Sequence, residues 1–145
     1  MTDAPRFSDP DEAEEAFYAA FETADLDGMM KLWADDDTIT CVHPGGSRLV
    51  GRDEVRESWR QIFRSQMRLS FRLTERHAIS DRNIAVHSVL EEIEVSGQGG
   101  LSAVVASTNV FVLTKDGWRI WMHHASNAAT SEEEADDAAE RPTLH

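Results

Sequence analysis

Two adjacent histidines, His123 and His124, are the side chains of this sequence best suited to moving protons. An imidazole changes charge near neutral pH, so it can act as a general base or a general acid. The pair lies in a segment that favours a strand, where neighbouring side chains point to opposite faces. The two histidines therefore cannot act on one ligand. The inner one is either a hydrogen-bonded structural histidine or a group for proton transfer.

His43 is a second candidate for the same interior, because it lies on one face of the alternating segment 38–43. A metal ion held by His43 and His123 would need a third ligand, and Asp37 or Glu92 would be arbitrary choices for it. The sequence therefore predicts neither a metal nor another cofactor.

The single cysteine, Cys41, excludes an internal disulfide and a cysteine-based metal site. Its neighbours in the strand are apolar, and no helix start or nearby cation would activate the thiol. We expect a buried thiol of low reactivity.

Several aromatic residues and one amide are expected to share the interior. Core packing accounts for most of the aromatic residues, but aromatic walls with a few polar groups also describe a small-molecule pocket. Asn109 stands in an apolar strand and needs hydrogen-bond partners if it is buried. It either ties neighbouring elements together or orients a ligand. The aromatic residues are Trp33, Trp59, Trp121, Phe17 and Phe21.

Composition limits the partners of the chain. Its 145 residues are the size of one domain, and 27 acidic against 14 basic side chains give a formal net charge of −13. This field repels phosphates, which argues against nucleic acid and against an anionic membrane surface as partners. The sequence has no apolar run long enough to cross a membrane, and its acidic start does not resemble a signal peptide. We expect a cytoplasmic protein.

The elements that must position these side chains are marked by caps and by apolar spacing. Asp9 followed by Pro10 predicts the start of a first helix, Asp25 caps a second, and a third is expected near 52–64. Alternating residues then predict a series of antiparallel strands. Helices on one face of a curved sheet make an α+β fold. The later strands are expected near 69–79, 84–95, 102–114 and 118–126.

The strand at 102–114 is apolar on both faces, with Val105 and Phe111 on one face and Val110 and Val112 on the other. Such a strand needs a covering layer on each side, and the helices can cover only the concave one. A second copy of the chain is the simplest cover for the convex face. The sequence therefore predicts a homodimer through that face.

The two ends of the chain differ from its middle. The acidic segment that ends the chain has too few apolar residues to offset the entropy of ordering it. We predict a flexible N-terminus at 1–8, a single α+β domain at 9–127 and an acidic disordered tail at 128–145.

The order of elements and four segments resemble the SnoaL-like branch of the nuclear transport factor 2-like superfamily. They also resemble the association domain of calcium/calmodulin-dependent kinase II. The resemblance implies a cone-shaped fold, with three N-terminal helices on a curved, mostly antiparallel sheet, and dimers through the convex sheet face. This fold hosts isomerases, dehydratases, cyclases, transport adaptors and assembly domains. The segments are DLDGMMKLWADDDTITCVHPGGSRLVG at 25–51, SWRQIF at 58–63, ASTNVF at 106–111 and GWRIWMHHAS at 117–126.

The resemblance also implies which side chains point inward. In the kinase association domain, a histidine and several arginines line a pocket for small carboxylates. The matching positions here carry no charge, so carboxylate binding by that means is not expected. The same matches put Asn109 inward, with Trp121 and His123 on the inward face of the last strand. The positions that have lost the charges are Trp59, Ser88, Asn109 and Ala125.

Steroid isomerases of this superfamily use an aspartate base, with a tyrosine and a protonated acid as the oxyanion hole. Tyr18 is the only tyrosine and lies on the predicted first helix. The strand acids Glu91, Glu92 and Glu94 are expected to be exposed. The sequence therefore offers no counterpart of that catalytic set.

Together these features predict a SnoaL-like domain that binds a small organic molecule in an apolar, aromatic-lined pocket. The alternative is an isomerase, dehydratase or hydrolase-type enzyme that uses a pocket histidine for proton transfer, with His123 as the catalytic candidate. The predicted pocket residues are Trp33, His43, Trp59, Ser88, Asn109, Trp121 and His123.

Overall fold

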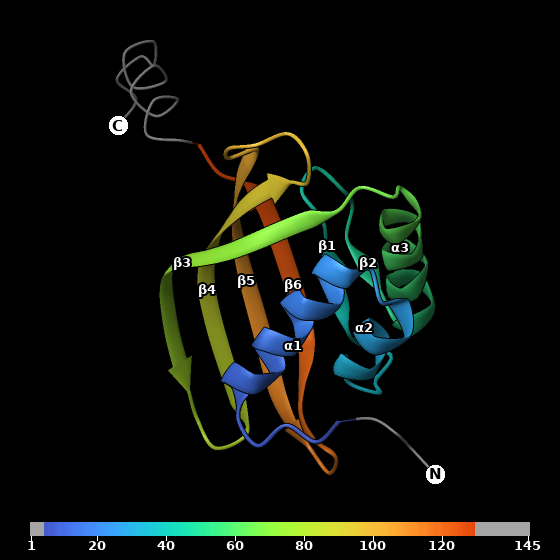
Figure 1. The fold of residues 1–145 in the computed structure, drawn as a ribbon. Helices are drawn as coiled ribbons and strands as arrows, with labels where there is room; N and C mark the ends of the chain where they lie inside the picture. The colour runs from blue at the N-terminus through green and yellow to red at the C-terminus, as the bar shows by residue number, and fades with distance from the viewer. Residues whose placement is uncertain (1–4, 130–145) are drawn as a thin grey trace, which may run out of the picture.

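Three helices pack against one face of a strongly bent sheet in the computed structural model, which describes residues 5–129 (Figure 1). The predicted α+β class and the predicted order of elements are confirmed. A short strand that the sequence did not indicate, β2, precedes the third helix. The elements are α1 (Pro10–Thr23), α2 (Leu26–Leu32), β1 (Thr40–Val42), β2 (Leu49–Val50), α3 (Arg52–Arg64), β3 (Leu69–Ser80), β4 (Ile84–Val95), β5 (Ala103–Thr114) and β6 (Gly117–Asn127).

The sheet has the strand order β2-β1-β6-β5-β4-β3. All pairs are antiparallel except β1 with β6, which is parallel. β3 is irregular between Thr74 and His77, where Glu75 has a φ of 47°. Such a bulge bends a strand, and β3 curves around one end of α1 (Figure 1). The bent sheet and the helices enclose the core.

The caps of the first two helices are those that the sequence predicts. The Asp9 side chain accepts a hydrogen bond from the backbone N–H of Glu12 at 2.9 Å, and Pro10 is the first helical residue. Asp25 caps α2 in the same way, through the N–H of Gly28. Each cap satisfies a backbone donor that a helix start leaves unpaired. These caps fix where α1 enters the concave side of the sheet.

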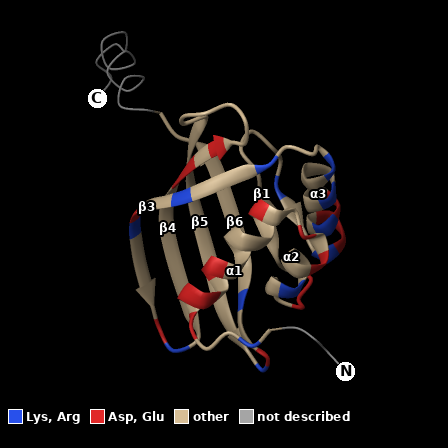
Figure 2. Ribbon diagram, viewed as in Figure 1, with Lys and Arg blue, Asp and Glu red and all other residues tan. Residues whose placement is uncertain are grey.

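The arginines of α3 gather at the outer side of the molecule, interspersed with acids (Figure 2). Arg60 pairs with Glu57 at 2.7 Å, and Arg56 lies 3.6 Å from Asp27 of α2. Arg52 differs, because its guanidinium donates to backbone carbonyls at the end of α2, including that of Met30 at 3.0 Å. It therefore fastens α3 to α2.

Residues 5–8, assigned to the flexible N-terminus by the sequence, lie against the start of β6. The backbone carbonyl of Phe7 accepts from the N–H of Trp118 at 3.1 Å, and Arg119 donates to the carbonyl of Pro5 at 2.6 Å. Most of the predicted acidic tail, 130–145, lies outside the described residues. Between residues 5 and 129, none of the helices is long and apolar enough to span a bilayer.

Candidate functional site

A chain of hydrogen-bonded polar side chains crosses the interior between α1 and the concave face of the sheet. It begins at His123 of β6, whose Nδ1 lies 2.6 Å from Oδ1 of Asn109 on β5. The amide nitrogen of Asn109 donates to Oε2 of Glu14 and to the hydroxyl of Tyr18, each at 3.1 Å. Glu14 and Tyr18 both lie on α1. The contacts therefore join the first helix to the middle of the sheet.

The chain ends at Glu91 of β4. Tyr18 donates its hydroxyl to Oε2 of Glu91 at 2.5 Å, and Ser107 donates to the same oxygen at 2.8 Å. Glu91 is only 2% exposed. Burial raises the pKa of this carboxyl, although the two hydrogen bonds counteract the increase. Burial and the neighbouring Glu91 carboxyl also raise the pKa of Tyr18, so its hydroxyl keeps its proton.

A second branch leads from Glu14 toward the surface. Oε2 of Glu14 lies 3.0 Å from Nδ1 of His87, and Oε1 lies 3.3 Å from Nε of Arg76. Arg76 also contacts Asp11 at the start of α1. Arg76 lies within the irregular stretch of β3 between Thr74 and His77, and its guanidinium reaches α1. The carboxyl group of Glu14 is thus paired on both oxygens although its side chain is buried.

Aromatic rings surround the His123 end of the polar chain. Trp59 of α3 is fully buried, and its ring centre lies 5.6 Å from that of Phe17 and 6.2 Å from that of His123. The indole Nε1 atoms of Trp59 and Trp33 are buried without a hydrogen-bond partner among residues 5–129. A buried donor that lacks an acceptor costs about 1–3 kcal/mol. An acceptor on a ligand would remove this cost at Trp59.

His43 of the β1 segment reaches the same aromatic cluster. Its ring centre lies 4.8 Å from that of Trp59 and 6.4 Å from that of His123. Nε2 of His43 lies 3.0 Å from the hydroxyl of Ser58. Burial lowers the pKa of His43 to about 4 and that of His123 to about 3, and the nearby histidines add to the second effect. Both imidazoles are therefore neutral at pH 7.

Cys41 lies beside His43, with Sγ 3.5 Å from Nε2. Burial raises the pKa of the thiol to about 12, so the group stays protonated and unreactive. Within the described part of the chain, no three His, Cys, Asp or Glu side chains are arranged to hold a metal ion.

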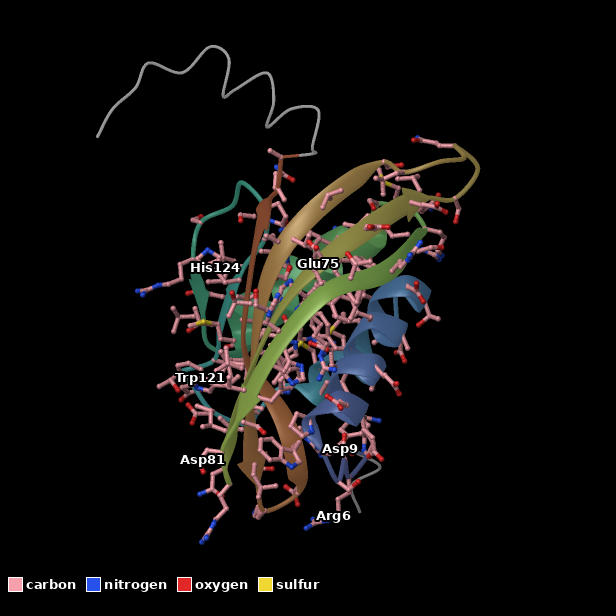
Figure 3. The ribbon with its side chains drawn as sticks, turned by 90° about the vertical axis from the view of Figure 1, so that its left-hand side faces the viewer. Arg6, Asp9, Glu75, Asp81, Trp121 and His124 are labelled. Atoms are coloured by element: carbon pink, nitrogen blue, oxygen red, sulfur yellow. The ribbon has the colours of Figure 1, made fainter. Side chains whose placement is uncertain are left out.

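The structure brings five of the seven predicted pocket residues into the interior and leaves two elsewhere. Ser88 is exposed and pairs with Thr108, which is also exposed, on the outer face of the sheet. Trp121 differs from its predicted orientation because β6 carries an extra residue opposite Val110 and Phe111. Figure 3 shows Trp121 and His124 on the side of the sheet away from α1. The five are Trp33, Trp59, Asn109 and His123, which are buried, and His43, which is half-buried.

A large cavity lies beside this polar chain rather than around it. It measures about 810 Å³ and opens between the end of α2 and the β5–β6 hairpin. Trp121, whose Nε1 donates to Thr38 at 3.0 Å, lines it together with Arg119 and Val112. Two of the seven predicted pocket residues, Trp33 and Trp121, therefore border this cavity.

Sequence reasoning missed Tyr18, Glu91 and Glu14 as members of the site. The sequence places Tyr18 on the first helix without a special role, and it predicts that Glu91 is exposed with the other acids at 91–94. The strand period contains a signal for Glu91, because it is two and four residues from Val89 and His87, which are both buried. Glu14 precedes Tyr18 by four residues, which is the spacing of two side chains on the same face of a helix, and both lie on the buried face of α1.

Comparison with known proteins agrees with this architecture. A protein from Thiobacillus denitrificans, described as a candidate association domain of calcium/calmodulin-dependent protein kinase type II, is 37% identical in sequence. It superposes with a TM-score of 0.79 over 86% of this chain and 99% of its own. A candidate dehydratase of the NTF2-like family from Streptomyces avermitilis is 36% identical, with a TM-score of 0.74 over 83% of this chain and 94% of its own.

A longer plant protein is similar to this chain over part of its length. The F-box protein SKIP8 of Arabidopsis thaliana is 26% identical over 111 residues, which are 76% of this chain. The chain spans only 46% of the length of that relative. The SnoaL-like domain family matches residues 11–130, from the first turn of α1 to just beyond β6, and so includes every element that builds the buried polar chain. The protein therefore belongs to the SnoaL-like domain family.

Proposed function

We propose that this domain binds a small, uncharged organic molecule in the interior, between α1, α3 and the concave face of the sheet. The observation that carries the proposal is the indole N–H of Trp59, which is fully buried and lacks an acceptor among residues 5–129. A ligand carbonyl or hydroxyl oxygen would supply that acceptor. Native proteins leave few buried donors unpaired, so such a donor marks a place for a missing partner.

The chemistry around Trp59 favours a neutral ligand. His43 and His123 are uncharged at pH 7, because burial lowers both pKa values. The rest of the wall consists of aromatic rings, including Phe17 at 5.6 Å and Phe21 at 4.8 Å between ring centres. An anionic ligand would lose its hydration and gain no cationic partner there. A neutral ring compound would keep its contacts with the aromatic rings.

We propose that a ligand enters this site between the ends of α1 and α3 and the start of β3. Three half-buried phenylalanines lie there, and the ring centre of one of them, Phe21, lies 6.2 Å from that of Phe63 and 4.5 Å from that of Phe71. Rotation of these side chains would open a path without moving the backbone. The three residues are Phe21, Phe63 and Phe71.

The test uses the indole N–H signals of ¹⁵N-labelled protein. The chain has four tryptophans, so each signal can be assigned by substitution. Cyclohexanone and phenol serve as neutral probes, and benzoate serves as the charged comparison. We expect the neutral probes to shift the Trp59 signal and benzoate to leave it in place. Trp59→Phe should weaken binding, whereas Trp118→Phe, a matched change at another buried tryptophan, should not. If neither neutral probe moves the Trp59 signal, the proposal is wrong.

A proton-transfer enzyme is the second candidate. It is favoured by Glu91, a buried carboxyl with a raised pKa that contacts Tyr18, and by one solved relative that is described as a candidate dehydratase. Solvent deuterium exchange at the carbon next to a ketone carbonyl would reveal such activity by NMR. An enzyme of this kind would exchange the α-hydrogens of cyclohexanone faster than buffer does, and Glu91→Gln and His123→Gln would show which residue carries the proton. A simple binder would give the buffer rate.

We also propose that two copies of the domain associate through the outer face of the sheet. β5 directs Val104, Val110 and Val112 to that face, and the neighbouring strands add Ile79, 75% exposed, and Ile84. Exposed branched apolar residues in a sheet favour burial against another surface. The self-complementary partner that this requires is a second copy related by a two-fold axis.

Light scattering with Ile79→Asp tests the association. Ile79 is exposed in the single chain, so a charge there should leave the fold intact and produce monomers. Gln61→Asp on the exposed side of α3 is the control and should leave the mass unchanged. A monomeric wild-type protein at micromolar concentration would rule out the dimer.

A further inference from the structure

The orientation of the Asn109 amide is determined by its neighbours. Its nitrogen faces two oxygens, Oε2 of Glu14 and the hydroxyl of Tyr18, each at 3.1 Å. Tyr18 uses its single O–H to donate to Glu91 at 2.5 Å, so its oxygen is free to accept. The carboxyl of Glu14 is paired with Arg76 and accepts as well. A flipped amide would set its carbonyl oxygen against both acceptors, which excludes that arrangement.

This orientation fixes the tautomer of His123. Because both N–H groups of Asn109 are engaged, the atom that meets Nδ1 of His123 at 2.6 Å is the carbonyl oxygen Oδ1. An oxygen can only accept, so Nδ1 carries the ring proton. A neutral imidazole has one N–H, and the other nitrogen, Nε2, therefore presents a lone pair.

The direction of the whole chain supports the same result. The other donors point toward the acidic end, because Asn109 donates to Glu14 and Tyr18, and Tyr18 donates to Glu91. A donating Nδ1 of His123 continues that direction. Hydrogen bonds aligned in one direction strengthen one another. Among residues 5–129, the bond to Asn109 is the one that the structure gives to the His123 ring.

We propose that Asn109, held by Glu14 and Tyr18, fixes His123 as the Nδ1-protonated tautomer and thereby makes its Nε2 a selective acceptor for ligands that carry an N–H or O–H donor. Together with the indole N–H of Trp59, this selects neutral molecules with a donor beside an acceptor, such as lactams, cis-amides and hydroxyketones. The ring centres of Trp59 and His123 lie 6.2 Å apart, so both rings are near enough to contact the same small molecule. The ligand class rests on the proposed function, whereas the tautomer does not.

Long-range ¹H–¹⁵N NMR of the ligand-free protein tests the tautomer directly, because protonated and unprotonated imidazole nitrogens resonate far apart. We expect the protonated signal at Nδ1 of His123 and the unprotonated signal at Nε2. Glu14→Gln replaces an acceptor by an amide that can also donate, so it should permit the flip of Asn109 and shift His123 toward the other tautomer. Glu15→Gln, the same change at the exposed neighbouring position, should have no effect. A protonated Nε2 in the wild-type protein would overturn the proposal.

Paired probes test the ligand class. δ-Valerolactam offers an N–H donor beside its carbonyl, and N-methyl-δ-valerolactam retains the carbonyl without the donor. We expect the first to bind roughly tenfold more tightly by titration calorimetry, because the second leaves Nε2 without its donor. Equal binding of the two lactams would refute the selectivity and leave the binding function intact. If neither lactam binds while phenol or cyclohexanone shifts the Trp59 signal, the ligand class is wrong. If no neutral probe binds, the proposed function fails together with the ligand class, and the tautomer is judged by its own spectrum.

Discussion

Asn109 and His123 stand directly opposite each other on β5 and β6, and their side chains meet with Oδ1 2.6 Å from Nδ1. Both side chains are buried, and each depends on the other for this hydrogen bond. The contact joins a neutral imidazole to a polar chain that continues to α1. Stability and the proposed ligand recognition therefore depend on the same residues.

Asn109→Leu should lower the free energy of unfolding by at least about 2 kcal/mol. The change leaves Glu14, Tyr18 and His123 without their common partner, and each unsatisfied buried group costs about 1–3 kcal/mol. Urea denaturation measures the loss. Thr108→Val alters the exposed neighbouring position and should stay within about 0.5 kcal/mol. Equal effects from the two variants would show that the amide contacts contribute nothing.

Tyr18→Phe should cost about 1–3 kcal/mol, because it removes one hydroxyl that donates to Glu91 and accepts from Asn109. The ring and its packing against Phe17 and Phe71 are retained, so the loss reports the hydroxyl alone. Thr23→Val removes an exposed hydroxyl from the same helix and serves as the comparison. A Tyr18→Phe protein as stable as the wild type in urea would contradict the buried network.

His123 should make the domain less stable in acid. Its pKa falls from 6.5 in the unfolded chain to about 3 in the folded one, mainly through burial. Below pH 6.5 the unfolded chain therefore binds more protons, so the free energy of unfolding falls as the pH falls toward 3. At about pH 4.5 the loss amounts to roughly 2–3 kcal/mol. His43, whose pKa falls to about 4, acts in the same direction.

Comparison of the wild type with His123→Gln at pH 7 and pH 4.5 isolates this effect. The loss of stability between the two pH values should be about 2–3 kcal/mol smaller in the variant. The comparison is needed because Glu91, whose pKa is raised by burial, has the opposite effect. Its contribution to stability is present at low pH and is lost as the pH rises above the ordinary pKa of a glutamate side chain. An identical pH dependence in the two proteins would mean that His123 is protonated as easily in the folded state as in the unfolded one.

Gly117→Ala should destabilise the domain more than Gly45→Ala. Both glycines have a positive φ, 97° and 75° respectively, which strains any other residue. At Gly117 an added Cβ would also lie 2.8 Å from the carbonyl oxygen of Phe7, whereas at Gly45 it would meet nothing within 4 Å. Thermal unfolding of the two variants separates the steric contact from the backbone strain. If the two melting temperatures match, residues 5–8 do not hold their place against β6 in solution.

The elements were predictable because their signals are local. The third helix and the strand at 84–95 have the expected bounds, and Asp9 and Asp25 cap the first two helices as their positions indicate. Capping depends on residues three or four positions apart, and strand alternation depends on residues two apart. Both kinds of pattern can be recognised in one sequence without knowledge of the fold.

The polar chain was only partly predictable because it depends on distant pairs. Asn109 stood out as an amide in an apolar strand, but its partners Glu14 and Tyr18 lie 95 and 91 positions away. Glu91 was hidden in an acidic run, although its alternate neighbours are apolar. Trp121 does not point inward as predicted, because a bulge in β6 breaks strict alternation. No residue type in the segment indicates that bulge.

The extra residue in β6 also changes which side chains of that strand face the core. Before it, Trp118 and Ile120 face the core, and after it His123 and Ala125 do, so the inward positions change from even to odd numbers. Deleting Trp121 would remove the bulge and restore strict alternation, with Ile120 and His123 still opposite Phe111 and Asn109. In a relative that lacks the extra residue, an alignment without a gap would match His123 to a position that faces the opposite side of the sheet. Transfer of a functional role between relatives must therefore follow the strand pairing and not the residue count.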